Sequence, residues 1–296
     1  HEVLVWAVVL YLGQVVKDLF CLPRPSCPPV IQLEKHYATE YGLPSTHAMT
    51  SIALSNYLFY YTYHYYNYPW IVGYCVVVCW VFLTCCSRLY LGVHSFIDIY
   101  VGLGLGFSLV YMAMQLGPSI DGYILQHDNY WIPLGIIATF VFMLAVYPRN
   151  KKIWSSSFGD TARVIGVACG CFLADWATSE SLHIPFSVLS QNWASSTWFT
   201  TTWKLMLARC IVGYAVMFMS KTVTKKFMYS VTPVVVEKLG LGKGYIPNVD
   251  NCNRYIIEIP CVFVTYSHIG FAAVYSGPKV MQFLGIAPEQ LTSMIL

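Results

Sequence analysis

The stretch that decides the fold joins two apolar runs, residues 69–87 and 93–116, and reads Ser87-Arg88-Leu89-Tyr90-Leu91-Gly92-Val93-His94-Ser95-Phe96-Ile97-Asp98. Each run is long enough to cross a bilayer core of about 30 Å as a helix. On a helix, His94 and Asp98 share one face because they are four residues apart. A carboxylate so placed holds one imidazole nitrogen and leaves the other free to act as a nucleophile or base. The stretch therefore predicts two membrane-spanning helices with a reactive histidine at their junction.

The composition of the whole chain is that of a membrane protein. Of its 296 residues, 57% are hydrophobic and only 10% are charged, and the mean hydropathy is +0.56. A soluble domain contains about a quarter charged residues. The net charge of +3 is too small and too scattered for a nucleic-acid-binding surface, so we expect no nucleic-acid partner.

Eight apolar segments predict an all-α fold, a polytopic bundle of transmembrane helices. They lie near residues 2–20, 46–64, 69–87, 93–116, 131–148, 162–179, 203–220 and 256–275. We expect one integral membrane domain over residues 1–296, with its catalytic motifs in 17–98 and with further spans upstream of His1. Residues 221–255 carry several charged side chains, and we expect them at or outside the membrane interface.

A second cluster of ionisable residues lies at the end of the first predicted span. Ionisable groups are costly there, so their presence indicates a function. Lys17 precedes Arg24 by seven positions, and Pro23 and Pro25 flank the arginine. Two cations held in this way suit a multiply charged anion. The alternative is that both side chains extend to the lipid headgroups.

A third cluster precedes the apolar run from Ala48 and reads Tyr41-Gly42-Leu43-Pro44-Ser45-Thr46-His47. Ser45 or Thr46 can cap the helix that begins there, and the free backbone N–H groups of its first turn then face an anion. His47 is placed to donate a proton. Its alternative role is that of a capping or interfacial histidine, and the pair of His94 and Asp98 also has a purely structural alternative.

The order of membrane crossings brings the three clusters to one face of the membrane. Lys17 and Arg24 follow the first span, His47 opens the second, and the motif from Arg88 to Asp98 joins the third and fourth. Three cations, a helix N-terminus and two histidines at one face describe a phosphate pocket. Such a pocket needs no metal or other cofactor.

Small residues have two interpretations in this chain. Gly92 and the series Gly102-x-Gly104-x-Gly106 mark either close backbone approach or ordinary helix packing in a membrane. Most of the 11 cysteines lie inside apolar runs and lack the paired spacing of a zinc site. We therefore interpret them as small core residues and expect no metal ligands among them.

Together the three clusters resemble the signature of the type-2 phosphatidic-acid phosphatase superfamily, which contains lipid phosphatases and vanadium haloperoxidases. The residues that match, in order, are Lys17, Arg24, Pro25, Pro44, Ser45, His47, Ser87, Arg88, His94 and Asp98. Thr46 stands where many members have Gly, and with its neighbouring sequence it resembles the sphingosine-1-phosphate phosphatase branch. The close resemblance covers about residues 11–106.

The resemblance implies a role for each of these residues. His94 attacks the phosphorus and forms a phosphohistidine, and Asp98 orients it. His47 protonates the leaving lipid alkoxide and later activates the water. The implied phosphate-binding residues are Lys17, Arg24 and Arg88, with the N–H groups near Ser45 and Thr46.

The implied activity is metal-independent hydrolysis of sphingosine 1-phosphate or related long-chain-base phosphates, which enter from the bilayer of the endoplasmic reticulum. One alternative is a broader phosphatase for phosphatidic acid, lysophosphatidic acid or polyprenyl pyrophosphate. A vanadate-dependent haloperoxidase shares the same pocket but is generally soluble. A non-enzymatic membrane transporter or lipid-binding relative is the alternative from a different class, although such a protein has no use for His47 and an oriented His94.

Two arguments about membrane sidedness disagree. The loops opposite the motifs, near residues 64–68 and 117–130, contain no Lys or Arg, whereas Arg149, Lys151 and Lys152 follow a span on the motif face. The positive-inside rule therefore puts the pocket in the cytosol. The resemblance implies a pocket that faces the lumen of the endoplasmic reticulum. We follow the resemblance, because catalytic cations contribute to the charge count.

Overall fold

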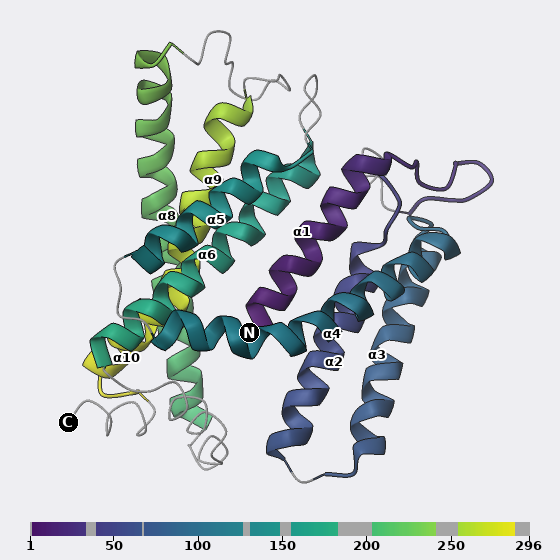
Figure 1. Cartoon of the computed structure of the whole chain (residues 1–296), viewed down its shortest axis with the longest axis horizontal. Coiled ribbons are helices and arrows are strands. Elements are labelled where there is room, and N and C mark those ends of the chain that lie inside the picture. Colours follow the sequence, from purple (N-terminus) through teal and green to yellow (C-terminus); the bar gives the residue numbers. More distant parts are fainter. Residues whose placement is uncertain are drawn as a thin grey trace. The chain divides into compact units, whose positions relative to one another are not determined.

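The computed structural model describes residues 2–33, 40–66, 68–126, 131–148, 155–182, 203–240 and 254–287. Every regular element in these ranges is a helix, so the predicted all-α fold is confirmed (Figure 1). The helices are α1 (Glu2–Phe20), α2 (Thr46–Tyr65), α3 (Trp70–Tyr90), α4 (Phe96–Gln126), α5 (Trp131–Val146), α6 (Ser156–Leu182), α8 (Trp203–Lys238), α9 (Arg254–Phe271), the π-helix η3 (Ala272–Ser276) and α10 (Gly277–Phe283).

All eight predicted spans correspond to helices. Within the described ranges, six stretches are long and apolar enough to cross a membrane, in α1, α3, α4, α6, α8 and the run from α9 to α10. The other two predicted spans are α2, which carries more polar side chains, and α5, which has only 16 residues. Helix α8 continues to Lys238, beyond residue 220 where the seventh span is predicted to end.

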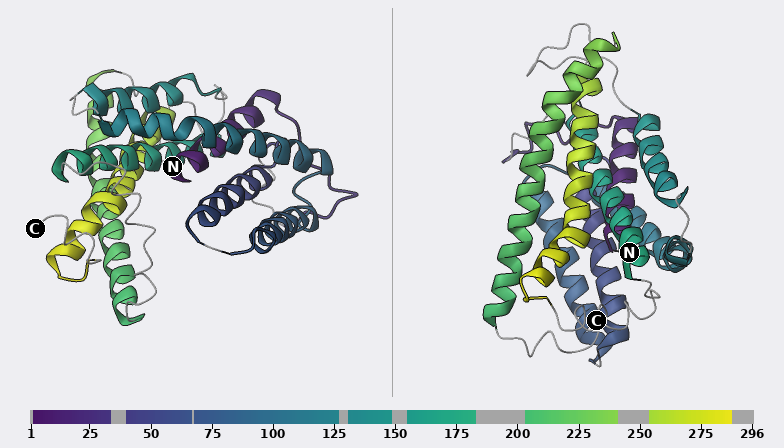
Figure 2. Two further views of the ribbon diagram at one scale, coloured as in Figure 1. Left: turned by 60° about the horizontal axis from the view of Figure 1, so that its bottom comes forward. Right: turned by 90° about the vertical axis from the view of Figure 1, so that its left-hand side faces the viewer.

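The chain divides into two compact units. Unit 1 comprises residues 1–119 and 147–161, and unit 2 comprises residues 120–146 and 162–296. In unit 1, α1 packs against α2, and α2 packs against α3 (Figures 1 and 2). Its buried core fixes α2 between α1 and α4 through Val5, Val9, Met49, Ala53, Tyr57 and Val110.

Two glycines let α4 approach the first turns of α2. A Cβ atom on Gly102 would lie 2.8 Å from the carbonyl oxygen of Ser45, and one on Gly106 would lie 2.5 Å from that of Met49. Gly104, in contrast, faces open space. Close backbone approach is therefore the correct interpretation for Gly102 and Gly106, and it places the start of α4 against the start of α2.

Helix α3 shows the character of a lipid-facing element. It has 21 residues, which span about 31 Å at ~1.5 Å per residue, close to the thickness of a bilayer core. Large apolar side chains are exposed along it, including Trp70, Val76, Trp80 and Phe82. A helix that is apolar on all sides and exposes such residues is suited to contact with lipid chains.

Unit 2 contains none of the predicted site residues. Its helices α8 and α9 lie side by side (Figure 2) and bury a core of Val236, Ile257 and Cys261. The guanidinium of Arg254 lies 3.6 Å from the carboxylate of Glu258 within α9. All the predicted site residues therefore lie in unit 1.

Candidate active site

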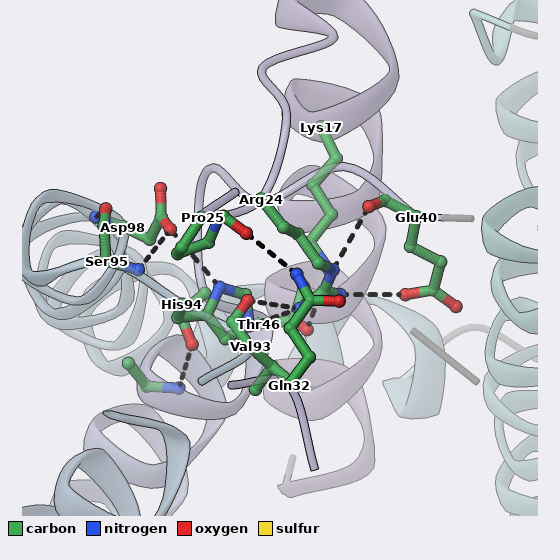
Figure 3. Close-up of polar contacts among 12 residues, drawn as sticks. Lys17, Arg24, Pro25, Gln32, Glu40, Thr46, Val93, His94, Ser95 and Asp98 are labelled. Carbon is green, nitrogen blue, oxygen red and sulfur yellow. Dashed lines mark hydrogen bonds and ion pairs between the residues drawn. The ribbon is translucent and has the colours of Figure 1, made fainter. Parts of the chain in front are cut away.

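The three sequence clusters meet in unit 1 and line one small polar pocket. Its walls are formed by Lys17, Arg24, Glu40, Thr46, His47, Arg88, Val93 and His94. Lys17 comes from α1, Arg24 from the segment that follows α1, and His94 from the turn between α3 and α4. Figure 3 shows these three side chains converging from their separate segments. The structure thus brings the clusters together as the order of crossings predicts.

His94 lies in the turn before α4, not on the helix as predicted. The helix begins after Ser95, because Ser95 and Asp98 cap it reciprocally. The backbone N–H of Asp98 donates to Ser95 Oγ at 3.2 Å, and that of Ser95 donates to Asp98 Oδ2 at 2.7 Å. This pair forms a capping box. Gly92 provides the preceding turn, with a φ of +67° that favours glycine.

The carboxylate of Asp98 also faces the imidazole of His94. Asp98 Oδ2 lies 3.6 Å from His94 Nδ1, which is longer than a hydrogen bond, and both side chains are buried. The other ring nitrogen, Nε2, lies 3.4 Å from Nη1 of Arg24. A guanidinium has no acceptor, so a hydrogen bond here requires an unprotonated Nε2 with the ring proton on Nδ1. In that tautomer the lone pair of Nε2 is directed at the guanidinium of Arg24, inside the pocket.

The surroundings of His94 keep its imidazole neutral. Burial lowers its pKa below the usual 6.5, the Asp98 carboxylate acts in the opposite direction, and the charges of Arg24 and Lys17 lower it further. Desolvation and nearby cations both disfavour the imidazolium ion. Near neutral pH, His94 is therefore suited to act as a nucleophile or base rather than as an acid.

Arg24 is held in place by backbone carbonyls and one carboxylate. Its Nη1 donates to the carbonyl of Val93 at 2.6 Å, its Nε donates to the carbonyl of Glu40 at 3.1 Å, and its Nη2 lies 3.4 Å from Glu40 Oε2. The following segment is fixed by Gln32, whose side chain donates to the carbonyl of Pro25 at 2.8 Å (Figure 3). The guanidinium is thus held in one position at the pocket, a geometry suited to an anionic group.

Lys17 is almost completely buried at the end of α1, with 2% of its surface exposed. Its Nζ donates to Thr46 Oγ1 at 3.4 Å, at the start of α2. The neighbouring Asp18 accepts hydrogen bonds from Tyr147 at 2.7 Å and from Ser155 at 3.2 Å. The ammonium group of Lys17 therefore lies at the wall of the pocket, while the carboxylate of Asp18 is bound by hydroxyl groups.

Of the remaining predicted phosphate ligands, two line the pocket and one lies outside it. Arg88, near the end of α3, and Thr46 both line the pocket. Ser45 does not line it. The backbone N–H of Ser45 donates to the carbonyl of Asp98 at 3.0 Å, and its Oγ accepts from Ala48 N at 3.4 Å as the N-cap of α2. These contacts identify Ser45 as the cap of α2, and phosphate binding by the N–H groups near Ser45 and Thr46 stays a prediction.

Glu40 is the charged pocket residue to which the sequence analysis gave no role. Its side chain is 9% exposed, its Oε1 accepts from Ser156 at 3.3 Å, and its Oε2 pairs with Arg24. A buried carboxylate beside an anion site is unfavourable unless it is paired. We therefore assign Glu40 to the positioning of Arg24. Its position directly before the cluster from Tyr41 to His47 could have indicated a place in the pocket. Its pairing with Arg24 was not predictable from spacing, because the two residues are 16 positions apart.

A large apolar groove of unit 1 begins where the polar pocket ends. It has a volume of about 840 Å³ and lies between α1, α2 and α3. Thr46 and His47 line both the groove and the pocket. Thr62 also lines the groove, about 24 Å from Thr46 at ~1.5 Å per residue of α2. Apolar members of the wall include Trp6, Leu10, Leu54, Leu58, Phe59, Val72, Val76, Val77 and Trp80.

Comparison with known proteins agrees with this geometry. A sequence profile of the PAP2 superfamily matches residues 3–120. The chain is 32% identical to sphingosine-1-phosphate phosphatase 2 of Mus musculus over 288 residues, which cover 96% of this chain and 78% of that protein. It is 31% identical to sphingosine-1-phosphate phosphatase 1 of Mus musculus over 296 residues, which cover 96% of this chain and 65% of that protein.

A plant relative is also similar over most of the chain. Lipid phosphate phosphatase delta of Arabidopsis thaliana is 27% identical over 306 residues, which cover 94% of this chain and 69% of that protein. The chain spans 65% of the length of the mouse and rat sphingosine-1-phosphate phosphatase 1 proteins. No solved structure matches the chain. The resemblance that the three motifs predict is confirmed.

Proposed function

Because the chain belongs to the PAP2 superfamily, we propose that it hydrolyses lipid phosphates in a membrane, with sphingosine 1-phosphate and related long-chain-base phosphates as substrates. One observation supports this proposal above the others. The cationic pocket at His94 and the apolar groove share Thr46 and His47. A lipid phosphate at this junction has its phosphate among the cations and its chain in the groove.

The first step of the proposed reaction transfers the phosphoryl group to the enzyme. Nε2 of His94 attacks the phosphorus, the new P–N bond forms, and the P–O bond to the lipid breaks. His47 donates a proton to the departing lipid oxygen, so the long-chain base leaves as an alcohol. The carboxylate of Asp98 stabilises the positive charge that develops on the His94 ring.

The second step releases inorganic phosphate. His47, now deprotonated, accepts a proton from a water molecule as its oxygen attacks the phosphorus and the P–N bond breaks. His94 returns to its neutral form. In both steps the guanidinium groups of Arg24 and Arg88 and the ammonium group of Lys17 bind the non-bridging oxygens and stabilise their charge in the transition state. These cations supply the charge that a metal ion supplies in other phosphatases, so we propose that the reaction needs no metal.

The proposed location is the endoplasmic reticulum membrane, with the pocket facing the lumen. Similarity to the sphingosine-1-phosphate phosphatases supports it, whereas the positive-inside rule favours a cytosolic pocket. A tag inserted in the connection between α4 and α5 tests the orientation by protease protection in sealed microsomes. A luminal pocket puts this tag on the cytosolic side, where protease removes it. Protection of the tag would overturn the proposed orientation.

The activity is tested by phosphate release from sphingosine 1-phosphate, phosphatidic acid, lysophosphatidic acid and a polyprenyl pyrophosphate, with the purified full-length protein. We expect the highest kcat/KM for sphingosine 1-phosphate, and we expect His94→Ala to release no phosphate. His64→Ala is the matched control, because His64 lies at the other end of α2 and lines neither the pocket nor the groove. Equal rates on all four lipids would instead identify a broad lipid phosphatase. Binding without phosphate release would identify a non-enzymatic relative.

A further inference from the structure

The face of α2 toward the groove is polar beside the reaction site and more apolar beyond it. The residues of α2 that line the groove are Thr46, His47, Thr50, Ser51, Leu54, Ser55, Leu58, Phe59 and Thr62. Their spacing of three and four residues places them on one face of the helix. A wall that serves only a hydrocarbon chain needs no hydroxyl groups, so those next to His47 require an explanation.

Thr50 differs from its neighbours in its hydrogen bonding. Ser51 Oγ donates to the carbonyl of Ala48 at 3.0 Å, and Ser55 Oγ donates to the carbonyl of Ser51 at 2.6 Å. Thr50 Oγ1 is buried from solvent and has no hydrogen-bond partner within the described part of the chain. A buried hydroxyl without a partner is unfavourable, and such groups in native structures call for a reason. A ligand in the groove supplies that partner.

The position of Thr50 identifies the part of the ligand that it reaches. It lies one turn beyond Thr46, about 6 Å along the axis of α2 at ~1.5 Å per residue. Thr46 contacts Lys17 at the wall of the phosphate pocket. A lipid with its phosphate in that pocket and its chain in the groove therefore passes Thr50 with the carbons next to the phosphate ester. In a long-chain-base phosphate, these carbons carry an ammonium group and a hydroxyl group.

We propose that the hydroxyl of Thr50 accepts a hydrogen bond from this amino-alcohol group. Thr50 is thereby a residue that determines which lipid phosphate the enzyme prefers. The inference rests on the proposed function and deepens it, because it concerns the choice among lipid phosphates that share the same reactive centre. A site built to hydrogen-bond a substrate group discriminates against analogues that lack the group, since its own polar atom then stays unpaired. Straight-chain alkyl phosphates are such analogues.

The test compares kcat/KM for sphingosine 1-phosphate with that for an alkyl phosphate of equal chain length, in the full-length protein. Thr50→Val keeps the shape of the side chain and removes the hydroxyl, and we expect the ratio of the two values to fall about tenfold. Thr50→Ser restores the hydroxyl and should restore the ratio. The matched control is Ser108→Ala, because Ser108 lies on α4, outside the groove, and donates to the carbonyl of Gly104.

The possible results separate the inference from the proposed function. Hydrolysis of both substrates by the wild type, with the same ratio in Thr50→Val, would overturn the inference and leave the phosphatase function standing. Failure of the wild type to hydrolyse either substrate would overturn both. A base phosphate without the hydroxyl on its third carbon identifies the group that is bound. If that analogue is still sensitive to Thr50→Val, the ammonium group is the donor, and if it is insensitive, the hydroxyl is the donor.

Discussion

The substitution Glu40→Gln tests whether a buried carboxylate positions Arg24 for catalysis. Glu40 Oε2 lies 3.4 Å from Arg24 Nη2, and the two side chains are only 9% and 5% exposed, so solvent screens the pair weakly. Gln keeps an acceptor oxygen but removes the charge. A hydrogen bond to a charged partner contributes about 1.5–3 kcal/mol, and one between neutral groups about 0.5–1.5 kcal/mol. The Gln side chain still accepts a hydrogen bond from the charged arginine, so only part of the interaction energy is lost. We expect a loss of about 1.4 kcal/mol in transition-state stabilisation, which corresponds to about tenfold in rate.

The steady-state kinetics of phosphate release check this expectation. We expect Glu40→Gln to lower kcat about tenfold without raising KM, because the loosened guanidinium stabilises the transition state less well while a negative charge beside the phosphate disappears. The matched control is Glu258→Gln, which removes a carboxylate paired with Arg254 in unit 2 and should leave kcat unchanged. A Glu40→Gln variant with the kcat and melting temperature of the wild type would refute the positioning role. An increase in kcat would show that Glu40 only repels the substrate.

Four further predictions follow from the site and the fold. The pKa of His94 is lowered by burial and by the nearby cations, so loss of activity through protonation of Nε2 should occur below pH 6.5 in the pH profile of kcat/KM. Asp98→Asn removes the carboxylate that raises this pKa, so besides reducing the rate it should move the acid limb to still lower pH, and a shift to higher pH would contradict the assignment. EDTA should leave phosphate release unchanged, whereas loss of activity that magnesium restores would show a required metal. Gly106→Ala should lower the melting temperature in detergent, because the new Cβ would lie 2.5 Å from the carbonyl oxygen of Met49. We expect the free energy of unfolding to fall by about 1–3 kcal/mol. An unchanged melting temperature would show that α4 moves freely away from α2.

The assembly of the pocket was predictable because it depends on the order of membrane crossings. Apolar runs of the required length fix where each helix of unit 1 begins to within a few residues, and an odd or even number of crossings then fixes the face. This reasoning places Lys17, His47 and His94 together, and the pocket contains all three. It needs no knowledge of how the helices pack.

The details that the sequence did not reveal depend on hydrogen bonds and packing. Ser45 carries the right groups for a phosphate ligand, but its N–H donates to the carbonyl of Asp98, a tertiary contact that spacing does not reveal. The pairing of Glu40 with Arg24 is equally non-local. The charged residues after position 220 predict the membrane interface, and they did not reveal that α8 continues as a helix to Lys238. In this part of α8, the ammonium groups of Lys221 and Lys225 lie 6.0 and 5.8 Å from the ring centres of Tyr266 and Tyr229. Such cation–π contacts are favourable for lysine side chains on a helix surface.

The capping box of α4 has a consequence for the surroundings of His94. One oxygen atom, Asp98 Oδ2, accepts the backbone N–H of Ser95 and also faces the ring of His94. The relation between carboxylate and imidazole is therefore encoded in five consecutive residues and requires no partner helix to set it. The first turn of α4 therefore places the carboxylate beside the imidazole without a contribution from α1 or α2. The placement of Asp98 beside His94 is local in the sequence, whereas the cations that line the pocket come from distant segments.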